Sequence, residues 1–346
     1  MNPTAPLERL VAGDPYLRFL RASFADSDAV AAGEALEKLG EPLLLERLAG
    51  DKLDAALEDR LNGLPPLLTP ATIEKLRRRR RNYLALNILR RAETEEVLSA
   101  LADSGISAVG LKGIDLAWRA YPDPSLRPFT DVDLLIAPKH LDAAEKIMAS
   151  LDYHPAPETA ALRASGEPWM DYQYEHADTG LLFELHVELL HHGRFRFDPA
   201  LALQRSVGGF LHPEDRFLHL ALHLAKHSYF DRLLWVYDLA VLAPDAPAPE
   251  TLAAAARATG CGGAVWLALA LARVLFGARL AEHEAELAPP PLRAQALTRT
   301  LAAYARGRGR ISARLLHFQL FDRLSEAFRY TAQRTARKWS GRKAGW

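Results

Sequence analysis

The sequence predicts an α+β fold, with a small mixed β-sheet core between mostly helical N- and C-terminal regions. Short apolar, β-branched runs of the kind that form strands occur only in the middle third of the 346 residues. There they alternate with helical segments, whereas the rest of the chain has helical spacing alone. We expect an N-terminal helical region over 1–68, the α+β core with its leading helix over 69–200, and a C-terminal helical region with a basic tail over 201–346.

The core is expected to begin with a long helix. Thr69-Pro70 has the pattern of an N-cap followed by proline at the first helical position, and helical spacing continues roughly to Ala102. Five consecutive arginines, Arg77–Arg81, lie in this segment. Consecutive residues point to all sides of a helix, so they predict a solvated collar, and nucleic-acid contact there is the less favoured interpretation.

The middle third is expected to hold the sheet. The expected strands are Ile106–Leu111, Thr130–Ile136, Asp171–Ala177 and Leu181–Leu190, the last two forming a hairpin. The expected helices are Ile114–Tyr121 and Lys139–Leu151. The stretch Pro155–Pro168 has the composition of a linker.

Helical spacing returns after Pro213. The expected helices are Glu214–Phe230, Leu233–Leu242, Thr251–Phe276 and Pro290–Arg306. The most apolar segment, Ala264–Leu280, contains two arginines and is shorter than the roughly 20 apolar residues of a membrane span. It therefore predicts a buried core helix, and we expect no membrane contact.

The charges of the chain cancel, since 43 Lys and Arg residues stand against 43 Asp and Glu residues. This balance excludes a uniformly basic nucleic-acid-binding surface, but the distribution is uneven. From Arg299 onward 12 basic residues accompany two acidic ones, and Arg329–Trp346 has no acid. We expect this last stretch to be a frayed tail rather than an arm that steers an anionic partner.

The chain has one cysteine, Cys261, which excludes an intrachain disulfide and a cysteine-only metal site. A single cysteine suits a reducing compartment. The N-terminal residues also lack a basic region followed by an apolar run. We therefore expect a cytoplasmic protein without a secretory leader.

The sharpest chemical feature is Asp131-Val132-Asp133 in an expected strand. Alternate residues of a strand point to the same side, so both carboxylates are expected on one face. Adjacent carboxylates repel each other unless a cation neutralises them, and hard oxygen ligands suit Mg²⁺ or Mn²⁺. Taken alone, the pair favours another interpretation, in which Asp131 caps a turn and Asp133 pairs with an arginine such as Arg127.

Two more segments place polar residues near expected strand ends. Lys112-Gly113 follows a strand and opens into a helix, where backbone N–H groups and an ammonium can hold a phosphate. An ordinary turn is the commoner meaning of this dipeptide. Glu184, His186 and Glu188 share one face of a later strand, where Glu184 could supply a third carboxylate. A solvated sheet face explains the same pattern without any function.

Together these segments have the layout of a two-metal nucleotidyl-transfer site: a phosphate turn, paired acids and a later single acid. Residues 105–190 resemble the uncharacterised nucleotidyltransferase family of the DNA-polymerase-β-like superfamily. The resemblance rests on LKG at 111–113, RPFTDVDLLI at 127–136 and ELHVELL at 184–190. Arg80–Asn82 and the pattern around His223, Trp235 and Asp238 extend it to roughly 77–243.

The resemblance implies roles for individual residues. Asp131 and Asp133 would bind metal ions, and Glu184 would be the third metal carboxylate and the general base. Lys112 and Gly113 would bind the triphosphate in place of the Gly-Ser turn of better-known members. Arg127 would be a phosphate-binding or structural arginine. Both Lys112 and Glu184 depart from the superfamily pattern, in which the third acid is usually an aspartate.

Three histidines, His219, His223 and His227, recur at every fourth position, on one face of an expected helix. Partly buried, hydrogen-bonded histidines are favoured here over a zinc site, because no acid ligand is adjacent. His223 and His227, like His186, are also candidates for lining the cleft.

The resemblance implies Mg²⁺- or Mn²⁺-dependent transfer of an NMP from an NTP, with ATP expected, to a hydroxyl-bearing acceptor. The acceptor would be a small molecule, sugar, peptide or protein. One alternative is a catalytically silent nucleotide-binding or scaffold protein, which the departures at Lys112 and Glu184 keep open. Another, less favoured, is a nucleic-acid-binding protein that uses its basic ends. The sequence indicates neither the acceptor nor the oligomeric state.

Overall fold

The computed structural model describes residues 2–61, 65–166, 168–190, 195–307 and 309–339. Contacts divide the chain into two compact units. The helical unit comprises Met1–Arg79, Gly193–Arg196 and Phe217–Trp346, and the sheet unit comprises Arg80–His192 and Phe197–Arg216. The predicted α+β class is confirmed, because one small mixed sheet accompanies many helices. The three regions expected from the sequence stay a prediction.

Five strands form the mixed sheet, in the order β1-β2-β5-β4-β3. Their bounds are β1 (Ala108–Leu111), β2 (Asp131–Ile136), β3 (Tyr153–Pro155), β4 (Asp171–His176) and β5 (Leu182–His186). β2 and β5 are parallel, and the other neighbouring pairs are antiparallel. In the β2–β5 register Asp133 lies opposite Glu184, which places two expected site residues side by side.

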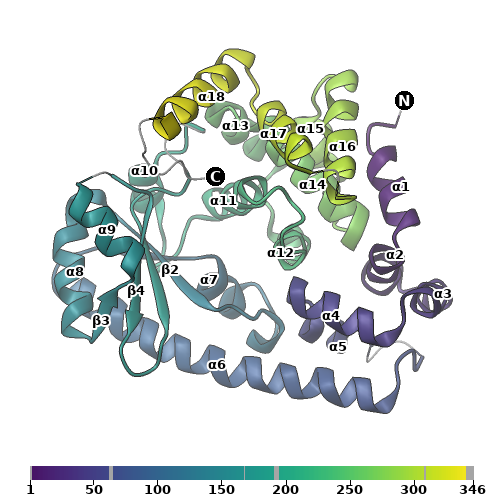
Figure 1. Ribbon diagram of the computed structural model, residues 1–346, viewed down its shortest axis with the longest axis horizontal. Helices are drawn as coiled ribbons and strands as arrows, with labels where there is room; N and C mark the ends of the chain where they lie inside the picture. Colours follow the sequence, from purple (N-terminus) through teal and green to yellow (C-terminus); the bar gives the residue numbers. More distant parts are fainter. Residues whose placement is uncertain (1, 62–64, 167, 191–194, 308, 340–346) are drawn as a thin grey trace. The chain divides into compact units, whose positions relative to one another are not determined.

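Helices cover this sheet, and α7 contacts β1 and β2 while α8 and α9 contact the β3–β4 end (Figure 1). The helices with residues in this unit are α6 (Pro70–Asp103, from Arg80 onward), α7 (Lys112–Arg119), α8 (Leu141–Ser150), α9 (Pro157–Ser165), α10 (Pro199–Arg205) and α11 (Pro213–Lys226, up to Arg216), with 3₁₀ turns η2 (Pro124–Leu126) and η3 (Pro138–His140). The expected strands and helices of the middle third are therefore confirmed, with β5 ending at His186 and leaving Glu188 outside it.

The expectation of a linker over Pro155–Pro168 is wrong. The residue Pro155 ends β3, and α9 begins at Pro157 and is followed by Gly166. Proline at the first helical position loses no helical hydrogen bond, because the first N–H groups of a helix have no partner within it. Gly166 has a φ of +66° at the C-cap, a conformation that glycine adopts readily. These residues therefore start and stop a helix.

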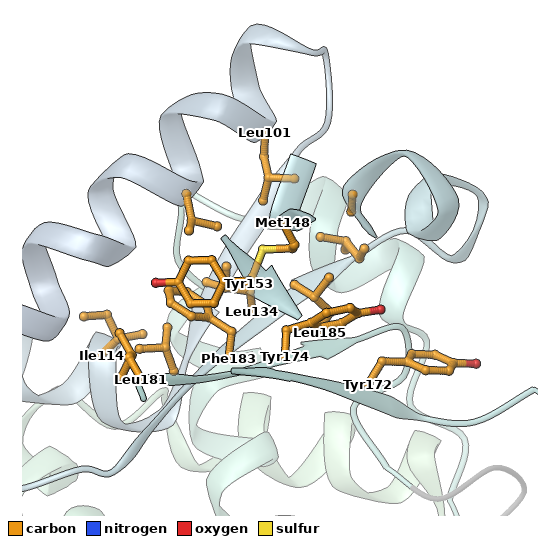
Figure 2. Packing of buried hydrophobic residues seen from close by; sticks show 14 of the residues in the cluster. Leu101, Ile114, Leu134, Met148, Tyr153, Tyr172, Tyr174, Leu181, Phe183 and Leu185 are labelled. Carbon is orange, nitrogen blue, oxygen red and sulfur yellow. The ribbon is translucent and has the colours of Figure 1, made fainter. Parts of the chain in front are cut away.

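One face of the sheet carries the main hydrophobic cluster. Figure 2 shows Leu134 of β2 and Phe183 and Leu185 of β5 gathered with Met148 of α8, and all four are buried. The Phe183 ring meets that of Tyr153 edge to face, with 5.0 Å between centroids. Burying a side chain of this size stabilises the fold by about 1.5–3 kcal/mol. The sheet thus holds its position by apolar burial on this face.

The helical unit is built around α14, which contacts α1, α2, α12, α13, α15 and α16. Its helices are α1 (Ala5–Gly13), α2 (Pro15–Arg21), α3 (Ala29–Leu39), α4 (Glu41–Asp51), α5 (Asp54–Leu61), the start of α6, α11 (Pro213–Lys226, from Phe217 onward), α12 (Leu234–Leu242), α13 (Pro249–Thr259), α14 (Gly262–Phe276), α15 (Ala281–Leu287), α16 (Pro291–Ala305), α17 (Gly309–Gln319) and α18 (Leu324–Trp339), with the π turn η1 (Ala22–Asp26) and the 3₁₀ turn η4 (Ala243–Asp245).

The expected buried core helix is confirmed in α14, where every residue except Arg273 is buried. The helix expected over Thr251–Phe276 is two helices, because Gly260 adopts a φ of +75° and ends α13. Within the described residues, no helix combines the length and the apolar character that crossing a bilayer requires.

Two expectations about basic segments are corrected. The stretch from Arg329 is helical as far as Trp339, in α18, and the rest of the expected tail lies outside the described residues. The arginines at 77–81 are more than a solvated collar. Arg77 and Arg79 pair with Glu58 and Asp54 of the helical unit, at 3.2 and 3.3 Å. These arginines give the buried acids Glu58 and Asp54 the counter-charge that burial requires.

Candidate active site

The candidate active site lies on the face of β2 and β5 opposite the main hydrophobic cluster. Because side chains alternate along a strand, Asp131 and Asp133 share one face of β2, and Glu184 and His186 share that face of β5. One oxygen each of Asp133 and Glu184 and one ring nitrogen of His186 lie within 4.8 Å of one another. Two carboxylates and an imidazole suit a divalent ion such as Mn²⁺, and the oxygens suit Mg²⁺.

Lys112, the first residue of α7, enters the same cluster. Its Nζ lies 2.5 Å from Oδ1 of Asp133, and Nε2 of His186 lies 2.8 Å from the same oxygen. The His186 nitrogen is also 3.4 Å from Oε2 of Glu184. Oδ1 of Asp133 is thus in contact with a lysine and a histidine in the described structure.

The four charged neighbours shift one another's pKa values. Burial by itself would raise the pKa of Asp133, but Lys112 and His186 hold it well below its usual range. Burial and the charge of Lys112 would lower the pKa of His186, but its hydrogen bonds to Asp133 and Glu184 raise that pKa to about 9. Burial also opposes the charge of Lys112, whose pKa is nevertheless raised by Asp133 and Glu184. The protein thus neutralises much of its own acid cluster.

Asp131 is placed differently from Asp133. It lies on the same face at the beginning of β2, outside the group of three ligand atoms that come within 4.8 Å. Burial raises its pKa, and repulsion from Asp133 and Glu184 raises it further. A carboxylate in that position gains from a cation beside it, so the metal role expected for Asp131 is physically reasonable and stays a prediction.

Close packing shapes the Lys112-Gly113 turn. Lys112 has a φ of +49°, which is uncommon for a residue other than glycine. A Cβ atom added at Gly113 would lie 2.4 Å from Cβ of Phe129. Glycine at 113 therefore allows the start of α7 to approach the segment that leads into β2. The phosphate-binding role expected for this turn stays a prediction.

Arg127 lies in the loop before β2 and is only 3% exposed. Its Nη1 donates to the carbonyl oxygen of Pro128 at 2.8 Å. Asn87 of α6 donates to the carbonyl oxygens of Pro124 and Arg127, at 2.8 and 3.0 Å. These contacts support the structural role that was expected for Arg127 as one of two possibilities, and its contact with phosphate stays a prediction.

Two residues near the acids were not expected from the sequence. Gln173 of β4 donates from Nε2 to Oε1 of Glu184 at 2.8 Å. The hairpin predicted from the sequence could have revealed this contact, because the register of its two strands places Gln173 opposite Glu184. Arg90 of α6 lies over the ring of Phe129, 5.6 Å from its centroid. Burial lowers the pKa of Arg90, and the charge of Asp131 opposes that lowering. No local pattern could reveal Arg90, because α6 is far from β2 in the chain.

The histidines at 219, 223 and 227 belong to the helical unit. His219 and His223 are buried, and the rings of His223 and His227 lie 4.5 and 4.7 Å from the ring of Trp235. Within the described parts of the chain, only the group at Asp133, Glu184 and His186 has the closeness that a metal ion needs. Buried histidines packed between helices, the favoured interpretation, fit these contacts. A role for His223 or His227 in lining the cleft stays a prediction.

The sheet unit combines a mixed sheet with clustered acids beside a lysine-glycine turn. The chain belongs to the uncharacterised nucleotidyltransferase family, whose sequence pattern matches residues 41–277. The match is longer on both sides than the 77–243 expected from motifs alone. No curated protein and no solved structure matches the chain.

Proposed function

We propose that the protein transfers an NMP from an NTP, with ATP as the expected donor, to a hydroxyl-bearing acceptor. The acceptor would be a small molecule, sugar, peptide or protein, and the reaction would require Mg²⁺ or Mn²⁺. The observation that carries this proposal is the cluster of Asp133, Glu184 and His186, with ligand atoms within 4.8 Å, in a chain of a nucleotidyltransferase family. A cytoplasmic location remains part of the proposal.

Asp131, Asp133 and Glu184 would hold the divalent metal. When bound, the metal supplies charge neutralisation for the triphosphate and the leaving group. The acceptor oxygen forms a bond to the α-phosphorus, the bond from that phosphorus to the oxygen bridging to the β-phosphate breaks, and pyrophosphate leaves. The acceptor's proton passes to Glu184, whose Oε1 is oriented by Gln173.

The environment of Glu184 supports this role. Burial would raise its pKa, but the hydrogen bond from His186 and the charges of His186 and Lys112 leave it below its ordinary value. Glu184 is therefore ionised at neutral pH, which both metal binding and proton acceptance require. His186 would orient Asp133 and Glu184 through its contacts with both.

Lys112 and Gly113 would hold the triphosphate at the beginning of α7, where backbone N–H groups have no helical partner. The Lys112 ammonium donates to Asp133 and has two further N–H donors for phosphate oxygens. Arg127 would support the loop before β2 and through it the position of Asp131.

A catalytically silent nucleotide-binding protein is the second candidate. The observation that favours it is the ion pair between Lys112 and Asp133, because the ammonium engages a carboxylate that would have to bind the metal for catalysis. Such a protein would bind nucleotide without transferring any part of it.

The test is incubation with ATP labelled at the α or the γ position, together with cell extract and Mg²⁺. Label from the α position on a product supports nucleotidyl transfer, and label from γ alone would indicate a kinase and refute the proposal. The Asp131→Ala variant should lose the stabilisation by Mg-ATP in thermal unfolding, while Asp178→Ala, at an exposed turn, should keep it. Stabilisation without transfer of label would favour the silent protein.

A further inference from the structure

We infer that the Lys112 ammonium takes the place of one of the two divalent ions of a nucleotidyl-transfer site, so that the site binds a single ion. This inference rests on the proposed function and concerns the number of ions. It makes Lys112 a built-in cation in direct contact with the acid cluster.

The position of the ammonium is the first argument. Its nitrogen is in direct contact with Oδ1 of Asp133, a carboxylate oxygen that would otherwise be open to a divalent ion. The two side chains are only 13% and 4% exposed. The lysine therefore stands inside the acid cluster, where an ion would otherwise stand, and not at its rim.

The backbone is the second argument. Lys112 has a φ of +49°, and a side chain other than glycine persists in that conformation only when its surroundings impose it. Directly after it, Gly113 is packed so closely against Phe129 that no Cβ would fit. The backbone of Lys112 is therefore fixed by the packing of Gly113, and its side chain is largely buried, unlike that of a surface lysine that samples many conformations.

The formal charges are the third argument. Asp131, Asp133 and Glu184 carry three formal negative charges, of which Lys112 compensates one. His186, in contact with Asp133 and Glu184, provides further compensation, so a single divalent ion suffices for the remainder. A second ion would stand within a few ångströms of the ammonium, and repulsion at about 4 Å would weaken its binding at least about tenfold even with the dielectric constant of water.

A lysine in this position also keeps the contact with phosphate that the sequence suggests. An ammonium has three N–H donors, of which one is directed to Asp133. The other two would bind oxygens of the triphosphate, as the replaced ion would.

The test counts bound ions. Mn²⁺ is titrated into the protein, with a non-hydrolysable ATP analogue present, and the free ion is followed by electron paramagnetic resonance. We expect one Mn²⁺ per chain for the wild type. Lys112→Met should bind two, whereas Lys112→Arg, which keeps the charge, should bind one. Lys139→Met removes an exposed lysine of the same unit and should leave the count at one.

Two ions bound by the wild type would overturn the inference and leave the proposed function standing, and so would an unchanged count in a folded Lys112→Met. No ion bound by the wild type would overturn the proposed function as well. If Lys112→Met does not fold, as thermal unfolding would show, the wild-type count and Lys112→Arg decide the matter.

Discussion

The two faces of the β2–β5 pair are built by the same alternation and have opposite properties. One face carries Leu134 and Phe183, which are fully buried in the main hydrophobic cluster. The other carries Asp133 and His186, which are 3% and 1% exposed. Apolar side chains gain free energy from burial, whereas buried charges cost free energy unless they are paired. The first face therefore stabilises the fold by apolar burial. The second combines a smaller buried cluster, which includes Leu135, with acids that Lys112 and His186 accompany.

The largest expected effect lies on the charged face. Asp131→Asn should lower transfer of α-label at least about 1000-fold, or ~4 kcal/mol, because it removes a carboxylate that holds the metal. The free energy of unfolding at neutral pH should stay the same or rise, since repulsion from Asp133 and Glu184 raises the pKa of Asp131 in the folded protein.

Activity and urea unfolding check this pair of outcomes, with Asp178→Asn as the control at an exposed position. A marked loss of stability in Asp131→Asn would mean that the charged face stabilises the fold after all.

The apolar face should respond in the opposite way. Phe183→Ala removes a ring with no exposed surface, and should lower the free energy of unfolding by about 3 kcal/mol or more. At a temperature where the variant is folded, its Mn²⁺ binding should remain within a few fold of the wild type. Urea unfolding and Mn²⁺ titration measure the two quantities. Loss of metal binding in a folded variant would contradict the separation of the two faces.

The start of α7 carries Lys112 of the acid cluster and packs Gly113 against Phe129, and Gly113→Ala tests that packing. The added Cβ would meet Phe129 at 2.4 Å, so we expect a loss of about 2 kcal/mol in the free energy of unfolding. Gly50→Ala is the matched control, because it lies in a helix and a Cβ there meets nothing within 4 Å. Similar unfolding midpoints for the two variants would show that the turn relaxes without cost.

A second buried acid of the sheet unit sharpens the comparison. Asp115 of α7 is 1% exposed, and burial raises its pKa to about 6 despite Arg216 at 3.5 Å. The Asp115 carboxyl therefore stays protonated in the folded protein at pH values where it is ionised in the unfolded chain. As a result, the free energy of unfolding decreases as the pH rises from about 3.8 to about 6.

Asp115→Asn keeps the neutral form, so the stability of the variant relative to wild type should increase by roughly 2 kcal/mol between pH 4 and pH 7. Urea unfolding at pH 4, 5, 6 and 7 measures this difference. A difference that does not vary with pH would mean that Arg216 and Arg119 offset the burial of the Asp115 carboxylate as fully as Lys112 and His186 offset that of Asp133.

Sequence patterns predicted the elements of the sheet unit well, and they failed where proline and glycine have two meanings. Pro157 and Gly166 were interpreted as a linker, but they start and stop α9. Both residues interrupt a helix in its interior and favour its ends, so composition alone does not distinguish the two cases. The basic segment from Arg329 also formed a helix rather than a frayed tail.

The sequence by itself determined which residues share a face, because strand and helix periodicity depends only on neighbours along the chain. It thereby placed Asp131 with Asp133 and Glu184 with His186, and its motifs identified the family. Only the tertiary structure decided that β2 lies parallel to β5 and that Lys112 reaches Asp133. These contacts depend on strand order and on close packing between distant segments, which no local pattern encodes.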